Sequence, residues 1–266
     1  MDKPYLSPSS LGMYFKCGEQ YRRRYICGEI VPPGFALIKG SAVHSAAEEN
    51  FKQKIKSHED MSHADIVDIA AAAFEAKYIK DGVLVIDEDG EKSKEVLHGE
   101  YLDSTVSSAK SLADNVLPKY QPIATEEKVR LELPESSHDL LGILDLIYED
   151  GIQDLKNTSK KMNQADVDSG LQFTIYSALY RSKYGKMPKE IAVDNIVHKA
   201  GAKKAAEYQT ILTTRSECDF TALANRMNAA IHGIRSEVFT PASPGSWWCG
   251  PKWCGFYHSC PHIAHK

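Results

Sequence analysis

A dense apolar segment followed by a turn signal constrains the fold of this chain most strongly. Leu140–Tyr148 is an almost continuous apolar run with a single acid, Asp145, in its interior. After it come Asp150-Gly151, a dipeptide favoured in two-residue hairpin turns, and a second stretch, Ile152–Lys156. Apolar runs of this length, bounded by turn residues, are typical of strands buried inside a sheet. We therefore predict a buried β-hairpin that turns at Asp150-Gly151.

The turn determines which residues of this hairpin face each other. It places Ile147 opposite Asp154 and Asp145 opposite Lys156, and directly paired residues share one face of a sheet. Asp145, Asp154 and Lys156 are therefore expected to converge. Burying two acids is costly unless positive charge compensates them, and Mg²⁺ prefers carboxylate oxygens. The hairpin thus predicts a divalent-cation site, with Lys156 placed to orient or deprotonate a water or to neutralise charge on a phosphate.

Composition and charge narrow the class of protein. The chain has 266 residues, of which 42% are hydrophobic and 26% charged, as in ordinary soluble globular proteins. No apolar run approaches the ~18 residues of a membrane helix, and the first ten residues do not resemble a signal peptide. We therefore expect a cytoplasmic protein that does not engage membranes. The net charge of −4 argues against general coating of nucleic acid but permits a local basic groove.

Hydrophobic periodicity predicts helices on both sides of the hairpin. The expected helices run from Pro8 to about Tyr25, from about Gly40 through Ile55, from Ser62 through Phe74, from Ser93 to Leu117, from about Asp168 to Tyr184 and from Ser216 through Ile234. Further strands are expected at Val129–Leu133, Ile191–Val197 and Tyr208–Thr213. The pattern predicts an α/β fold with a mixed central sheet flanked by helices.

Several motifs occur in the order found in one nuclease family. Gly142–Ile147 followed by Ile152–Asn157 resembles the core of the PD-(D/E)XK nucleases of the RecB type. Upstream, Gly40–His44 with Glu48 resembles the family helix whose histidine adds a metal ligand. Downstream, Gln172 and Tyr176 match its Gln-x-x-x-Tyr motif. The matching segments span most of the chain, which is identified as a member of this family with a restriction-endonuclease-like core.

The resemblance implies roles for individual residues and an activity. It implies that Mg²⁺ or Mn²⁺ is held by His44, Asp145 and Asp154, that Lys156 is the catalytic lysine, and that the site and the DNA strand are supported by Gln172 and Tyr176. The expected function is a DNA exonuclease that acts on single strands or DNA ends in recombination, repair or DNA processing. We expect one domain over residues 1–266, with a catalytic core at about 120–215. Because the sequence lacks a Gly-x4-Gly-Lys-Ser/Thr phosphate loop, a helicase or recombination partner would supply unwinding.

Four of the six cysteines suggest a second cofactor. Cys249, Cys254 and Cys260 lie in an aromatic segment, and thiols this close in a reducing compartment bind a metal or stay free. Cys17 is the natural fourth ligand. The segment Leu6–Leu11 followed by Cys17 resembles the start of iron–sulfur members of the same family, namely the CRISPR-associated RecB-like exonucleases and the nuclease domain of the AddB helicase subunit.

This second resemblance implies an iron–sulfur lobe. A four-iron, four-sulfur cluster (4Fe–4S) on these cysteines would join residues 1–30 and 240–266. Family members usually have two residues between the first clustered cysteines, whereas four separate Cys249 from Cys254. A structural Zn²⁺ is therefore the competing interpretation, with His258 and His262 as possible ligands. Cys27 and Cys218 are expected to be ordinary thiols.

Two alternative functions remain open from sequence. One is a non-catalytic iron–sulfur module for DNA binding or assembly, which would have no need of Asp145, Asp154 and Lys156. The other is a structure-selective endonuclease using the same site, which circular DNA would distinguish from an exonuclease.

Overall fold

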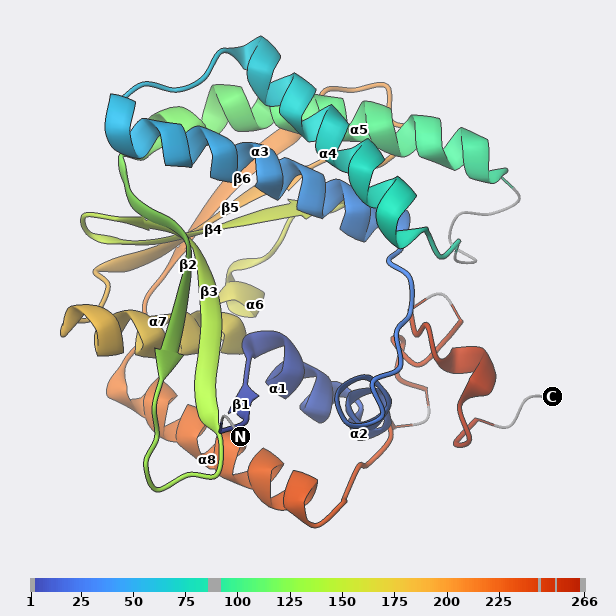
Figure 1. Ribbon diagram of the computed structural model, residues 1–266, viewed down its shortest axis with the longest axis vertical. Coiled ribbons are helices and arrows are strands. Elements are labelled where there is room, and N and C mark those ends of the chain that lie inside the picture. Colours follow the sequence, from blue (N-terminus) through green and yellow to red (C-terminus); the bar gives the residue numbers. More distant parts are fainter. Residues whose placement is uncertain (1–2, 86–91, 244, 252, 264–266) are drawn as a thin grey trace.

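A mixed β-sheet forms the centre of the molecule (Figure 1). The computed structural model describes residues 3–85, 92–243, 245–251 and 253–263, and within these residues the sheet has six strands. Their bounds are β1 (Tyr5–Leu6), β2 (Pro122–Leu131), β3 (Asp139–Tyr148), β4 (Gly151–Thr158), β5 (Glu190–Val197) and β6 (Glu207–Thr213). The order is β1-β3-β4-β5-β6, and β2 also pairs with β3. The pairs β1–β3 and β4–β5 are parallel, and the others are antiparallel.

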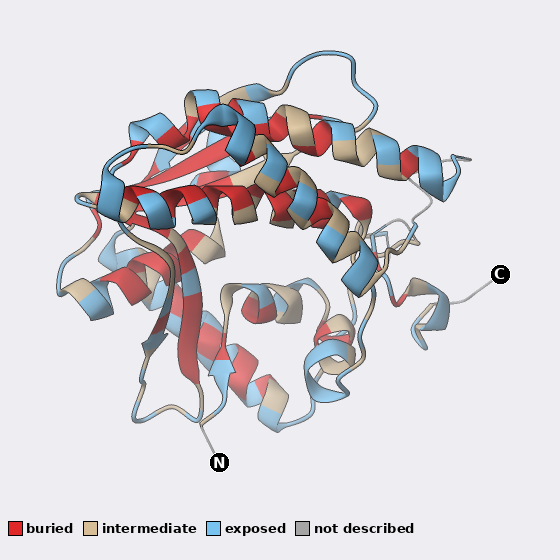
Figure 2. Ribbon diagram, turned by 45° about the horizontal axis from the view of Figure 1, so that its top comes forward, coloured by how far each residue is buried: buried red, intermediate tan, exposed pale blue. Residues whose placement is uncertain are grey.

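Helices cover both faces of this sheet, and buried residues gather where helix and sheet meet (Figure 2). One layer contains α3 (Phe35–Ser57), α4 (His63–Asp81) and α5 (Lys94–Asn115). The other contains α1 (Pro8–Lys16), α7 (Leu171–Tyr184) and α8 (Glu217–Arg235). Shorter elements are α2 (Gly18–Tyr21), a π-helical turn (Arg22–Ile26), α6 (Gln164–Asp168) and 3₁₀ turns at Leu117–Lys119 and Tyr257–Ser259. The predicted α/β architecture, a mixed sheet between helices, is confirmed.

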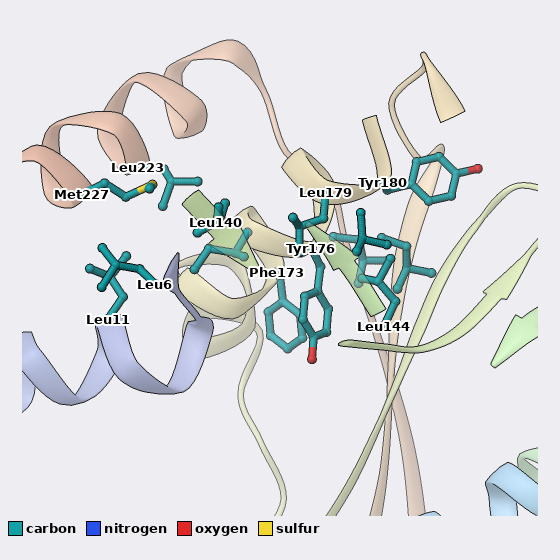
Figure 3. Packing of buried hydrophobic residues seen from close by; sticks show 14 of the residues in the cluster. Leu6, Leu11, Leu140, Leu144, Phe173, Tyr176, Leu179, Tyr180, Leu223 and Met227 are labelled. Carbon is teal, nitrogen blue, oxygen red and sulfur yellow. The ribbon is translucent and has the colours of Figure 1, made fainter. Parts of the chain in front are cut away.

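Apolar packing fixes the second helical layer against the sheet. Leu144 of β3 and Leu179 of α7 are fully buried in one cluster, together with Leu6 of β1 and Leu11 of α1 (Figure 3). Fully burying side chains of this size contributes about 1.5–3 kcal/mol each. The two-residue strand β1 was not predicted. Its buried Leu6 packs in this cluster and its pairing with β3 places the following helix, α1, beside that strand.

Helix caps lie where the sequence predicts them. Ser7 accepts a hydrogen bond from the Ser10 amide, and Ser62 accepts one from the Asp65 amide. Ser216 forms a capping box at the start of α8, and Gly185 ends α7 with φ 71°. The serine oxygens satisfy amides that have no partner inside the helix, whereas the Gly185 backbone amide donates to the Arg181 carbonyl. Elsewhere the boundaries differ, since α3 begins at Phe35 rather than near Gly40.

The hairpin forms, but its predicted register is wrong by two residues. Tyr148 pairs with Gly151 and Ile147 with Ile152, so the turn residues are Glu149 and Asp150. The glycine belongs to β4, because a Cβ there would lie 2.3 Å from the Glu190 carbonyl oxygen of β5. Gly151 thus permits close strand pairing and does not form the turn. A two-residue shift keeps each side chain on its predicted face.

The predicted first helix, Pro8 to Tyr25, is broken at Cys17. Cys17 has extended backbone (φ −163°, ψ 106°), and the Gly18 amide donates to the Thr240 carbonyl at 2.7 Å. A Cβ on Gly18 would lie 2.7 Å from backbone atoms of Phe239 and Thr240. The contact with a distant segment therefore overrides helical propensity and brings residues 17–18 against 239–240.

An ion-pair network fixes the start of the chain to the sheet. Asp139, which is buried, lies 2.6 Å from Lys3 Nζ and accepts hydrogen bonds from Arg130 Nε at 2.8 Å and the Leu133 amide at 3.1 Å. These contacts, above all the one from Lys3, hold the pKa of Asp139 well below its ordinary value.

Among the described residues, no helix is both long and apolar enough to cross a membrane.

We predict that Asp139→Asn destabilises the protein in a pH-dependent manner. Because folding lowers the pKa, the carboxylate stabilises the fold above its unfolded pKa of about 4, and this stabilisation is lost as the pH falls toward the lowered folded value. The difference in Tm between wild type and variant should therefore be largest near neutral pH and shrink in acid. Asp150→Asn, in the hairpin turn, is the control. A Tm difference that is constant across this range would contradict the assignment.

Candidate active site

A cleft of about 810 Å³ opens along one edge of β3, where part of the strand pairs with no other described strand. That edge pairs with β1 at residues 139–140 and with β4 at residues 146–148. The intervening segment faces the cleft, together with Ser7–Ser9 at the start of α1 and Gly40, Ser41 and His44 of α3. The cleft therefore lies between the two helical layers, beside the acidic residue of β3.

The strands β3 and β4 separate at the predicted acids. Their pairing ends at Leu146 with Gln153, and beyond this point the Leu155 amide donates to the Asp145 side chain at 3.0 Å. A carboxylate oxygen thus takes the place of a strand carbonyl. Asp145 and Asp154 are consequently brought to the opening between the strands.

Three ligand-bearing side chains meet on the side of α3. His44 Nδ1 lies 3.6 Å from Asp145 Oδ2, and one ligand atom each from His44, Asp145 and Glu126 lie within 4.8 Å of one another. Glu126 belongs to β2, where it has a positive φ of 48°. The sequence analysis missed Glu126. The only sequence signal is an adjacent pair of acids, Glu126-Glu127, beside a predicted strand, and that pattern alone does not indicate a site.

Glu126 sits in an acidic environment. Burial, together with the charges of Asp145 and Glu48, raises its pKa to about 7, while the charge of Lys52 opposes this shift. Clustered carboxylates of this kind repel one another unless a proton or a cation lies between them. Imidazole and carboxylate are suitable ligands for Mn²⁺ and Mg²⁺, so these residues fit a divalent ion.

Asp154 lies deeper, on the side of α7. Its side chain is fully buried, and Oδ1 accepts hydrogen bonds from Lys156 Nζ at 3.0 Å and Gln172 Nε2 at 2.9 Å. Oδ2 is 2.8 Å from the same ammonium but has no hydrogen-bond partner. Burial raises the pKa of Asp154 to about 6, with Lys156 opposing and Asp145 adding to the shift. Among the described residues, this buried oxygen has no hydrogen-bond partner besides its ion pair, and a carboxylate oxygen of this kind suits a divalent cation.

Lys156 remains a cation in this arrangement. Burial alone would lower its pKa, but the negative charges of Asp154 and Asp145 outweigh burial, so the pKa is raised. Its ammonium also donates to Gln172 Oε1 at 3.2 Å. The lysine is thus suited to neutralising negative charge and is poorly suited to accepting a proton.

Helix α7 completes the site. Gln172 Nε2 lies 2.8 Å from the Tyr176 hydroxyl, in addition to its bond to Asp154. Tyr176 is buried within the core cluster, with its hydroxyl directed away from the apolar side chains (Figure 3). The structure therefore places five of the predicted residues around one cleft, together with Glu126: His44, Asp145, Lys156, Gln172 and Tyr176. The sixth, Asp154, is fully buried beside the cleft, in contact with Lys156 and Gln172.

Arg215 holds the start of α7 in place. Its guanidinium donates to the carbonyls of Val167 at 2.9 Å and Gly170 at 3.2 Å and to the Thr174 hydroxyl at 2.9 Å. Gly170 is the N-cap of α7 and provides no side-chain cap. The arginine therefore fixes the turn that directs Gln172 into the cleft.

A larger cavity lies elsewhere. It has a volume of about 940 Å³, lies between α7, α8 and the β2–β3 connection, and is lined mainly by apolar residues such as Leu133, Phe220 and Met227. Among the described residues, no group of three metal ligands borders it. The smaller cleft is therefore the candidate active site, because it contains the ligand-bearing side chains and the larger cavity does not.

Comparison with known proteins places the chain in a family. The sequence profile of the PD-(D/E)XK nuclease superfamily matches residues 5–261. The chain belongs to the PD-(D/E)XK nuclease superfamily, whose members are metal-dependent nucleases. A search of curated proteins gave no match. A similar solved structure is entitled "Crystal structure of SSO0001", with 14% identity, a TM-score of 0.37, and coverage of 81% of this chain and 94% of that chain.

The four cysteines of interest lie near the two ends of the chain. The Ala242 amide donates to Cys17 Sγ at 3.3 Å, and Gln20 Nε2 donates to Cys254 Sγ at 2.9 Å. The pKa of Cys249 is raised by burial and by the thiols of Cys17, Cys254 and Cys260. Cys27 and Cys218 are exposed. Positions 1–2, 244, 252 and 264–266 of the predicted lobe lie outside the described residues.

We predict that Glu126→Gln weakens the binding of Mn²⁺ by about 10- to 100-fold, the range for losing a residue that supports a metal site. Isothermal titration calorimetry measures the affinity directly. Glu127→Gln is the matched control, because it removes the same charge from the adjacent position. Glu127 forms an ion pair with Lys183 and does not belong to the ligand group. Equal affinity in Glu126→Gln and wild type would exclude Glu126 from the metal site.

Proposed function

We propose that this protein is a divalent-metal-dependent DNA exonuclease that acts on single-stranded DNA or DNA ends. The observation that carries the proposal is the fully buried Asp154 carboxylate beside the acidic cleft. Its Oδ2 lies 2.8 Å from the Lys156 ammonium but has no hydrogen-bond partner among the described residues. The superfamily match supports phosphodiester hydrolysis, and the preference for single strands comes from the resemblance to RecB-type nucleases.

The metal site is proposed to use four side chains. His44, Glu126, Asp145 and Asp154 would hold Mg²⁺ or Mn²⁺, which supplies Lewis-acid polarisation of the phosphodiester when bound. The imidazole of His44 makes Mn²⁺ as suitable as Mg²⁺. The remaining steps depend on groups of the chain itself.

Lys156 is proposed as the catalytic lysine. Because its pKa is raised, its ammonium neutralises charge that develops on the scissile phosphate and does not take a proton from water. Gln172 orients both charged groups, since its amide donates to Asp154 and its carbonyl oxygen accepts from Lys156. A carboxylate only accepts and an ammonium only donates, so these two contacts fix which end of the amide faces each partner. The Tyr176 hydroxyl accepts a further hydrogen bond from the Gln172 amide and holds it in place.

The volume of the cleft is suited to a single DNA strand and not to a duplex. A volume of about 810 Å³ lies in the range of pockets that enclose small ligands, so it has room for one or two nucleotides and not for a duplex. A single strand or a frayed end would enter it. Cleavage of closed circular DNA would instead favour the structure-selective endonuclease.

We predict that Lys156→Ala retains Mn²⁺ binding but lowers the rate of DNA hydrolysis by about 10²–10³-fold, the effect of removing one charge-stabilising donor. The assay uses end-labelled linear single-stranded and duplex DNA with Mg²⁺, Mn²⁺ or EDTA. Lys77→Ala, which removes an exposed ion pair of α4, is the control. If folded wild-type protein leaves DNA intact with every ion, the non-catalytic DNA-binding module replaces this proposal.

We also propose a 4Fe–4S cluster on Cys17, Cys249, Cys254 and Cys260. A single Zn²⁺ with bonds of about 2.3 Å would need sulfurs about 3.8 Å apart, and no such group of cysteines occurs among the described residues. The three thiols of Cys17, Cys254 and Cys260 all influence the pKa of Cys249 without forming such a group, and this spacing suits a cluster, in which each sulfur binds a different iron. His262 lies 3.8 Å from Glu19, which does not favour it as a zinc ligand.

The proposed cluster divides the chain into functional parts. The catalytic core would span residues of about 120–215, and residues 1–30 with 240–266 would form the cluster lobe of a single nuclease domain. The bond between the Gly18 amide and the Thr240 carbonyl supports this pairing of the ends. A role in recombination, repair or DNA processing, with a helicase as partner, follows from the resemblance to iron–sulfur RecB-like nucleases.

We predict that anaerobically purified protein contains iron and absorbs visible light, and that Cys17→Ala loses both and unfolds at a lower temperature. Closing a loop of more than 200 residues restricts the unfolded chain, so losing the link lowers the free energy of unfolding. Cys27→Ala, an exposed cysteine of the same region, should change neither property. Stoichiometric zinc without iron would refute the cluster.

A further inference from the structure

An exposed aromatic surface lies at the end of α1 farthest from the cleft. Phe15 is 48% exposed and Trp247 is 66% exposed, and Lys16 Nζ lies 5.7 Å from the centre of the Trp247 ring. Trp248 and Trp253 contact Trp247 nearly at right angles, with ring centres 5.5 and 5.1 Å away. Phe15, Lys16 and Trp247 are called the tryptophan surface below. Large apolar groups exposed together mark a binding surface.

The charge around this surface favours an anionic partner. The two segments that build it, residues 3–18 and 238–266, contain no aspartate or glutamate, although the whole chain has 36. A groove of about 420 Å³ runs beside the surface and is lined by Phe15, Lys16 and Trp248. The combination of exposed aromatic rings, a lysine and no acids is suited to bases and phosphates.

Helix α1 sets the distance between this surface and the active site. Its first residues, Pro8 and Ser9, line the catalytic cleft, and its last two, Phe15 and Lys16, belong to the tryptophan surface. Figure 1 shows α1 lying between the sheet and the carboxy-terminal segment. Nine residues of helix measure about 14 Å, which corresponds to about four nucleotides at a spacing of 3.4 Å.

We propose that the tryptophan surface stacks with unpaired bases of the same DNA strand whose end lies in the catalytic cleft, about four nucleotides away. This inference rests on the proposed nuclease function and names how its substrate is held. Duplex DNA hides the faces of its bases, so only a single strand can stack in this way. A protein partner would gain no advantage from the absence of acids.

Intrinsic fluorescence tests this proposal selectively. The chain has three tryptophans, and all lie at positions 247, 248 and 253. We expect a thymidine oligonucleotide of about ten residues, long enough to span cleft and surface, to quench their emission without added divalent ion. The same length of duplex should quench much less. Binding of the oligonucleotide by gel shift without any change in emission would overturn the proposal.

Variants separate stacking from other effects. Trp247→Ala should weaken binding of the oligonucleotide at least about fivefold, whereas Trp247→Phe keeps most of the affinity. Ile79→Ala, which removes a 78% exposed apolar side chain from α4, should change nothing. Equal affinity in Trp247→Ala and wild type would refute stacking. Concentration-dependent self-association that is lost in Trp247→Ala, with DNA affinity unchanged, would assign the surface to a protein partner instead.

A small substrate distinguishes failure of this proposal from failure of the nuclease function. With Mn²⁺, Trp247→Ala should raise KM for the oligonucleotide and leave hydrolysis of a thymidine dinucleotide unchanged, because the dinucleotide cannot reach the surface. Slower hydrolysis of both substrates would mean that Trp247 supports the fold and would refute the proposal. If neither substrate is cut but the oligonucleotide still quenches emission, the nuclease function fails and the tryptophan surface stands.

Discussion

Burial of the Asp154 carboxylate on β4 is the constraint on which the active-site cleft depends. A buried charge without compensation costs several kcal/mol, so the surrounding residues are arranged to offset it. Lys156 supplies the positive charge and Gln172 a further hydrogen bond, yet Oδ2, although 2.8 Å from the ammonium, has no hydrogen-bond partner among the described residues. The compensation inside the protein is therefore incomplete, and a bound cation would complete it.

The same constraint explains the position of the neighbouring elements. β3 and β4 separate where Asp145 and Asp154 lie, and Asp145 accepts the Leu155 amide that strand pairing leaves free. Helix α7 must present Gln172 at this opening, and Arg215 fixes its first turn. Helix α3 closes the other side with His44. Each layer of helices thus contributes part of one site, and the open edge of β3 leaves a path into it.

Contacts between the two ends of the chain place α1 at this path. Lys3 binds Asp139 of β3, and the Gly18 amide binds the Thr240 carbonyl, so both ends of α1 are held from outside the helix. One end of α1 borders the cleft, and the other meets the aromatic segment near Trp247. The helix can therefore align a strand between a binding surface and a catalytic centre.

Local chemistry made much of this predictable from sequence. The apolar run around Asp145 indicated a central strand. The helix starts at Pro8 and Ser62 were predictable because the capping bonds of Ser7 and Ser62 reach neighbours only three residues away. The hairpin register was wrong because the close approach of β5 to Gly151 is not visible in the hairpin itself. Glu126 was missed because its place in the site depends on the pairing of β2 with β3.

Tertiary contacts account for the other differences. The two residues of β1 are too few to give a periodic signal, and their position depends on β3. The helix predicted from Pro8 to Tyr25 breaks where Thr240, more than two hundred residues later, packs against Gly18. Such contacts between distant segments cannot be derived from local patterns, whereas residue types suited to metal and phosphate chemistry can.

Parallel titration of metal binding and DNA hydrolysis tests the central claim most directly. Mn²⁺ would be added stepwise to wild type and Asp145→Asn, with calorimetric binding and release of nucleotides from single-stranded DNA measured on the same samples. The account predicts that in wild type both signals saturate over the same range of Mn²⁺ concentration, and that folded Asp145→Asn loses both. Hydrolysis that persists unchanged in Asp145→Asn, or that does not depend on Mn²⁺ or Mg²⁺, would contradict it.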